Sequence, residues 1–168
     1  MSMIGMFVRV TETELQDYIS DSTLFENLID HEDFDENPRV CNIDKTWDAI
    51  SYLLTGHGPS DLSNAKPPVS WTIFGSDVLD KNQDLGYGPA NYLTVEQVAL
   101  LNNKLSNISS KDLEANYNAD KMNELELYPN SWRKAEDEMN YIGNHFESLK
   151  KFYSTAASNR QAVICYLS

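Results

Sequence analysis

The feature that most constrains the fold is a stripe of apolar side chains near the C-terminal end of the chain. Its members are spaced three or four residues apart, which keeps them on one face of an α-helix. Ser131 directly precedes the stripe and is a residue type that caps helix N-termini, so we expect the longest helix to begin there. The stripe consists of Trp132, Ala135, Met139, Ile142, Phe146, Leu149 and Phe152.

Strands are predicted at the two ends of the chain, and such a helix could pack over them. Residues 4–10 and 162–167 are short runs rich in β-branched, aromatic and other apolar residues, a composition typical of strands. If these segments pair and helices pack over them, the fold class is α+β. We therefore expect a mainly helical single domain over residues 1–168, with a small sheet that includes the N- and C-terminal strands.

Shorter helices are indicated by capping residues. Thr11 with Glu14 and Thr94 with Gln97 have the spacing of capping boxes, and Ser109 or Ser110 precedes another short helical segment. Helical spacing also predicts helices over residues 24–29 and 120–127. Residues 30–36 and 57–69 are expected to be loops because of their charge and their Gly and Pro content, respectively. Residues 71–74 fit a strand or a buried helical turn equally well.

A helix over residues 45–55 carries the first group of candidate residues. Asp44 is expected to cap it, and Gly56 to end it. Trp47 and Ser51 lie four apart and therefore share one face, so a ligand could stack on the indole and bond the hydroxyl. The alternative is that Trp47 is a core anchor whose indole N–H bonds a backbone carbonyl. In that case, Asp44 and Asp48 would face solvent.

The charge of the chain limits its partners. It has 13 Lys and Arg against 26 Asp and Glu, a net charge of −13 over 168 residues. A surface this negative repels phosphate backbones, so we expect neither nucleic acid nor anionic membranes as partners. A basic protein partner is compatible with the charge, although acidity also serves solubility alone. The N-terminus lacks the pattern of a secretion signal, which predicts a cytoplasmic protein.

No metal site or cofactor is expected. Residues 80–91 resemble a calcium loop only superficially, because Gly86 falls at the seventh position and Asn91 replaces the bidentate glutamate at the twelfth. The two cysteines, Cys41 and Cys165, have no Cys or His neighbours in sequence that would suggest a metal cluster. Both are expected to be free, buried thiols.

Several motifs resemble the YfbM-like family of bacterial proteins, whose function is not established. They are DKTWD at 44–48, LLTG at 53–56, GYGPANYLT at 86–94 and LYP at 127–129. The resemblance implies a small cytoplasmic α+β domain with no assigned reaction. This chain has Ser51 where the family often has His, Asn91 where Arg or a similar residue is common, and Gly75-Ser76 in place of Gly-Gly. If that His and Arg are catalytic, this chain lacks them.

The segment from Gly86 to Tyr92 is the strongest pocket candidate. Its two glycines allow close approach of a ligand, and Tyr87 and Tyr92 offer flat faces and hydroxyls next to Asn91. The helix that follows would favour an anion at its N-terminus. The alternative is a purely structural turn that aims this helix.

Two further residues could do acid–base chemistry. His57 lies in a Gly- and Pro-rich loop and is a residue type that can act as an acid or a base, but no nucleophile motif accompanies it. Glu126 lies near the end of a predicted helix, two residues from Glu124, so the two carboxylates would point apart.

Two hypotheses about function follow. The first is a non-catalytic binding or interaction protein that engages another protein or a small molecule, in the manner of an inhibitor or antitoxin. The second is an enzyme that acts on a nucleotide-like small molecule. It predicts that one cleft brings together Trp47, His57, Tyr87, Tyr92 and Glu126, and Ser51 and Asn91 complete the set of candidate pocket residues.

Overall fold

The computed structural model describes residues 2–168 and is organised around a five-stranded antiparallel sheet of order β2-β1-β5-β4-β3. The terminal strands β1 (Gly5–Val10) and β5 (Ala162–Leu167) pair along their whole length, from Gly5 opposite Leu167 to Val10 opposite Ala162. Their predicted pairing is confirmed. The other strands are β2 (Val40–Asn42), β3 (Asp77–Val78) and β4 (Asn91–Leu93). These were not predicted, because two or three residues are too few to show alternation.

The sheet separates two apolar cores because successive strand residues point to opposite faces. Phe7 of β1 lies in the larger core with Val163 and Cys165 of β5. Val8 lies in the smaller core with Ile164. Helices cover both faces, so the predicted α+β class is confirmed.

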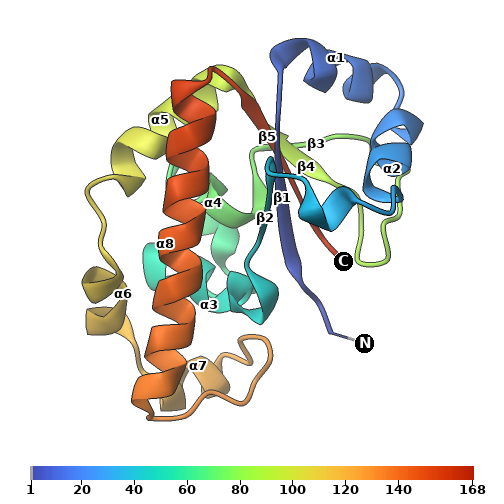
Figure 1. Cartoon of the computed structure of the whole chain (residues 1–168). Coiled ribbons are helices and arrows are strands. Elements are labelled where there is room, and N and C mark those ends of the chain that lie inside the picture. The colour runs from blue at the N-terminus through green and yellow to red at the C-terminus, as the bar shows by residue number, and fades with distance from the viewer. Residues whose placement is uncertain (1) are drawn as a thin grey trace.

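The larger core is covered by most of the helices (Figure 1). The long helix α8 runs beside α5, α6 and α3, with α7 near its N-terminal end. The smaller core lies under α1 and α2, which connect β1 to β2. The helix bounds are α1 (Glu12–Ser20), α2 (Thr23–Ile29), α3 (Trp47–Thr55), α4 (Trp71–Phe74), α5 (Val95–Leu105), α6 (Ser110–Asn116), α7 (Ala119–Glu124) and α8 (Glu136–Ser158).

The remaining features of the fold are short turns and helix caps. Three 3-10 turns are present: η1 (Phe34–Glu36), η2 (Asp44–Thr46) and η3 (Leu62–Asn64). The ambiguous residues 71–74 form the helical turn α4. The capping boxes at Thr11 and Thr94 are both formed, and Ser109 caps α6 in the same way. None of the helices in residues 2–168 combines the length and apolar character needed to cross a bilayer.

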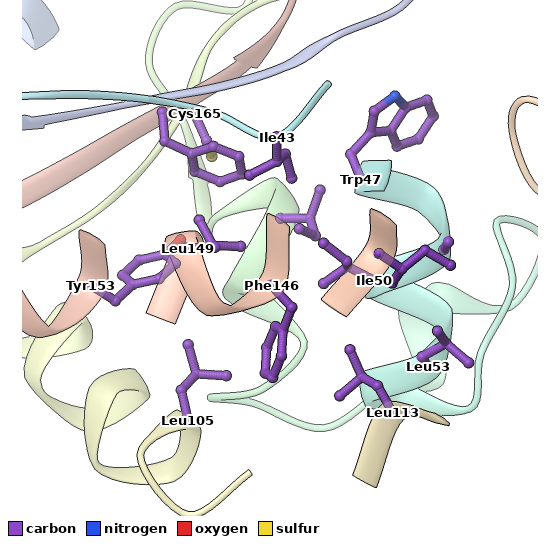
Figure 2. Packing of buried hydrophobic residues seen from close by; sticks show 14 of the residues in the cluster. Ile43, Trp47, Ile50, Leu53, Leu105, Leu113, Phe146, Leu149, Tyr153 and Cys165 are labelled. Atoms are coloured by element: carbon purple, nitrogen blue, oxygen red, sulfur yellow. The ribbon is translucent and has the colours of Figure 1, made fainter. Parts of the chain in front are cut away.

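The apolar stripe is confirmed over most of its length. Ile142, Phe146 and Leu149 of α8 are completely buried, and Figure 2 shows Phe146 and Leu149 directed into the core between α5 and α3. Tyr153, one position from the stripe, is also buried and donates its hydroxyl to the carbonyl oxygen of Thr72 at 2.7 Å. This bond joins α8 to α4.

The predicted start of the longest helix is wrong. The helix begins at Glu136 rather than at Ser131, and no side chain caps it. Trp132 is buried from the preceding loop, where its indole donates to the carbonyl oxygen of Leu127 at 3.0 Å. Asn123 bonds both the N–H and the C=O of Trp132. These contacts hold the Trp132 side chain in the core although its backbone is not helical. Its spacing from the stripe in the sequence therefore resembled that of a helix residue.

The predicted cap of α3 is also wrong. Asp44 has a φ of +49° and lies in η2, so α3 begins only at Trp47. Its carboxylate accepts the hydroxyl of Tyr141 at 2.7 Å, a tertiary contact with α8. At the other end, Gly56 adopts the left-handed conformation with φ +75° and ends the helix as predicted.

Candidate functional site

The structure does not bring the predicted site residues into one cleft. Asn91 and Tyr92 are neighbours on β4, and their partners on β5 are Cys165 and Ile164. Those partners belong to opposite cores, so the two β4 side chains point to opposite faces of the sheet. A pocket on one face cannot use both of them. The convergence that the enzyme hypothesis predicts is therefore not found.

Tyr87 and Glu126 are both exposed side chains. Tyr87 is 39% exposed in the loop between β3 and β4. In that loop, Gly86 and Gly88 both have φ near +100°, and Leu85 donates to the carbonyl oxygen of Gly88. This geometry matches the structural-turn alternative. Glu126 is exposed after α7, in the left-handed conformation.

Trp47 has the contacts of a core anchor. It is 7% exposed, and its indole N–H donates to the carbonyl oxygen of Met3 at 3.1 Å. The ring stacks on Tyr128 at 5.4 Å and meets Phe74 edge-on at 5.9 Å. Figure 2 shows Trp47 at the start of α3, at the margin of the core. Trp47 also lines a pocket.

This pocket, called here the α3 pocket, has a volume of about 220 Å³ and lies between α3, α4 and the loop around η3. It contains Trp47 and Ser51, two of the predicted site residues. Apolar groups form most of its wall, and Asp48 and Ser51 are its polar members. The lining residues are Trp47, Asp48, Ser51, Pro59, Leu62 and Phe74.

Asp48 is the residue of this pocket that sequence reasoning missed. It was expected to face solvent but is only 5% exposed, and one carboxylate oxygen accepts the backbone N–H of Tyr128 at 2.8 Å. No ion pair reaches it from residues 2–168. Burial raises the pKa of Asp48 above its usual range. The available signal was its spacing of three from Ser51, which places both on one helix face.

Replacing Asp48 with asparagine is expected to raise the free energy of unfolding at neutral pH. In the wild type, the raised pKa means that the ionised form is disfavoured by folding. The wild type therefore loses stability as the pH rises through the pKa of folded Asp48, and the uncharged variant does not. The difference should shrink as the pH falls through that pKa. Melting temperatures of both proteins from pH 8 to pH 4 measure it.

Asp61→Asn is the control variant for that experiment, because its free energy of unfolding at neutral pH is expected to change in the opposite direction. A hydrogen bond from His57 lowers the pKa of Asp61, so its stabilising contribution is present at neutral pH and is lost as the pH falls through the lowered pKa. The Asp61 variant should therefore be the less stable protein at neutral pH. Two variants that shift in the same direction would contradict the assignment of Asp48 as a buried, unpaired carboxyl.

His57 is placed beside the α3 pocket but not in its lining. Its Nδ1 lies 2.8 Å from Asp61, and its backbone N–H donates to the hydroxyl of Thr55. The loop that carries this pair also supplies Pro59 and Leu62 to the pocket wall. His57 therefore helps to shape the loop over the pocket.

A second cavity lies on the other face of the sheet and is called here the acidic groove. Its volume is about 550 Å³. The buried side chains of Met6, Phe34 and Tyr166 form an apolar floor. Four carboxylate side chains line the same groove and are called here the rim: Glu26, Asp30, Asp35 and Asp84.

The rim carboxylates have no cationic partner among residues 2–168, and no Lys, Arg or His lines the groove. Burial, followed by the charges of Asp35 and Asp30, raises the pKa of Tyr166, which places these carboxylates near its hydroxyl. The sequence indicated an acidic run at 30–36 but not that Phe34 turns inward from it. Within residues 2–168, no three His, Cys, Asp or Glu side chains gather as a metal site would require.

The fold and these two cavities define the chain as a small α+β protein with a groove and a pocket on opposite faces of one antiparallel sheet. The chain belongs to the family described as "Domain of unknown function (DUF1877)", whose model matches residues 1–166. The predicted resemblance is thus confirmed, and the family description carries no activity.

One relative in this family is the protein YfbM of Escherichia coli strain K12. It is 24% identical over 131 residues, which cover 77% of this chain and 74% of YfbM. The crystal structure of YfbM from Escherichia coli, described as a protein of unknown function, matches with a TM-score of 0.73 at 18% identity. The match covers 99% of this chain and 100% of YfbM, and it shows a shared fold.

Proposed function

We propose that this protein is a non-catalytic interaction protein of the cytoplasm, and that its acidic groove binds a basic, amphipathic segment of a partner protein. The single observation that carries the proposal is the set of four rim carboxylates, which have no cationic partner in the described part of the chain (residues 2–168), around an apolar floor. A segment with alternating apolar and basic side chains complements both parts of this surface.

The energetics favour such a partner over other ligands. Apolar side chains of the partner would pack on Met6, Phe34 and Tyr166. Each Å² of apolar surface that this contact removes from water would contribute roughly 25 cal/mol to the free energy of binding. Lys or Arg side chains would neutralise the rim, and the net charge of −13 would accelerate their approach. Anionic ligands would be repelled by the same charges. An acidic protein that covers a basic surface fits an inhibitor- or antitoxin-like role.

The test uses a fluorescent twelve-residue peptide of alternating Lys and Leu, with a Glu and Leu peptide of equal length as its counterpart. We expect saturable binding of the basic peptide that weakens with added salt, because exposed charges are screened. The double variant Asp30→Asn with Asp35→Asn should weaken binding about tenfold, since each rim pair contributes roughly 0.2–1 kcal/mol. Fluorescence anisotropy at 20 and 200 mM salt measures both effects.

The matched control removes two exposed carboxylates elsewhere. Asp17 lies on α1 and Asp137 on α8, and neither lines the groove. Asp17→Asn with Asp137→Asn changes the net charge by the same amount and should leave binding within about twofold of the wild type. An equal loss in both double variants would mean that the peptide responds to overall charge, and the groove would not be the binding site.

A further inference from the structure

We propose that the α3 pocket is a second binding site, and that its ligand is a small primary amine in the ammonium form held by Asp48 and Ser51. The α3 pocket adjoins the larger core, whereas the acidic groove lies over the smaller one. The two proposals therefore rest on different residues and different faces of the sheet.

Two buried polar side chains keep free hydrogen-bonding capacity in this pocket. Asp48 and Ser51 are each only 5% exposed. One oxygen of Asp48 accepts the N–H of Tyr128, and within residues 2–168 neither its other oxygen nor the Ser51 hydroxyl has a hydrogen-bond partner. Across the same residues, no fully inaccessible side-chain N or O atom lacks a partner. The free Asp48 oxygen and the Ser51 hydroxyl are therefore accessible to water, and both residues line the α3 pocket.

Without a ligand, the buried carboxylate of Asp48 is energetically costly. A buried carboxylate without a counter-charge opposes folding. Ordinary packing would place an apolar residue or a paired charge at position 48. A position that disfavours folding is characteristic of functional sites, and a cationic ligand would supply the missing charge.

The size and chemistry of the pocket favour an ammonium group on a short carbon chain. An ammonium group donates three hydrogen bonds, enough for the free Asp48 oxygen and the Ser51 hydroxyl. Trp47 and Phe74 line the same space, and aromatic side chains attract cations and pack against carbon chains. The volume of about 220 Å³ is about seven times the share of one water molecule. A short aliphatic amine therefore fits, whereas an anion is repelled by Asp48.

The test compares n-butylamine with n-butanol and butyrate on the wild-type protein at pH 7. An alkylamine is protonated at this pH, as the lysine side chain is. We expect butylamine to produce saturable NMR shift changes centred on the indole N–H of Trp47 and the backbone amides of residues 47–62. Butanol, which has the same length but no charge, should bind at least about tenfold more weakly, and butyrate should not bind.

Variants then assign the contacts. Asp48→Asn should weaken butylamine binding at least about tenfold while the protein stays folded, and Ser51→Ala should weaken it about threefold. Asp17→Asn removes an exposed carboxylate on α1 and should bind as the wild type does. Equal binding of butylamine and butanol by the wild type would overturn the proposal without any variant. So would unchanged affinity in the Asp48 variant, or shift changes confined to the acidic groove.

Discussion

Replacing Phe146 with alanine is expected to lower the free energy of unfolding by about 3–5 kcal/mol, the usual range for removing a buried aromatic ring. Phe146 is fully buried in the middle of α8. Figure 2 shows its ring between Leu105 of α5 and Leu113 of α6. The cavity left by the ring would lie where α8, α5 and α6 meet, and α8 and α5, which both pack against the sheet, would have to shift to close it.

Denaturant unfolding measures this effect, and two substitutions on the same helix bracket it. Phe146→Leu keeps most of the apolar volume and should cost clearly less than the alanine variant. Asn144→Ala changes an exposed residue two positions away and should stay within about 0.5 kcal/mol of the wild type. If Phe146→Ala were as mild as Asn144→Ala, α8 could not be the centre of the larger core.

Gly75→Ala is expected to have the second-largest effect, because the backbone at this position excludes a side chain. Gly75 has φ +63° and ψ −165°, a region that is essentially restricted to glycine and costs about 1–3 kcal/mol for other residues. An added Cβ would also lie 2.9 Å from the carbonyl oxygen of Tyr92. That oxygen accepts the N–H of Ser76, so the substitution would disturb the contact between α4 and β4.

Gly58→Ala is the matched control. An added Cβ there would meet the side chain of Leu125 at 3.8 Å, an ordinary contact, and Gly58 does not have the positive φ that disfavours alanine. We expect its free energy of unfolding to stay within about 1 kcal/mol of the wild type. Hydrogen exchange should show lost protection of the amides around β4 only in the Gly75 variant. Equal destabilisation by both substitutions would contradict the role assigned to the Gly75 backbone.

Patterns that depend on neighbouring residues were predicted correctly from the sequence. The α8 stripe, the capping boxes at Thr11 and Thr94, and the glycine stop at Gly56 all express contacts within four residues along the chain. The terminal strands carry enough β-branched residues to be recognised by themselves. Together these elements specify the α+β class, and the motifs identified the family.

Predictions that required knowledge of distant contacts were not reliable. Trp132 has helical spacing but is held in a loop by Asn123. Asp44 has the type and position of a cap but bonds Tyr141, 97 residues away. In both cases a tertiary hydrogen bond replaced the local one, because it satisfies the same polar groups and also positions a core element.

The sequence by itself therefore determined the elements with strong local patterns, the two terminal strands, the family and the acidity of the chain. Only the tertiary structure decided which candidate residues share a cavity. It separated Asn91 from Tyr92, because adjacent strand residues face opposite cores. It buried Asp48 beside Ser51, because Tyr128 and the loop around η3 cover α3. Burial depends on what distant segments place over a residue, and the spacing of that residue along its own helix or strand does not reveal it.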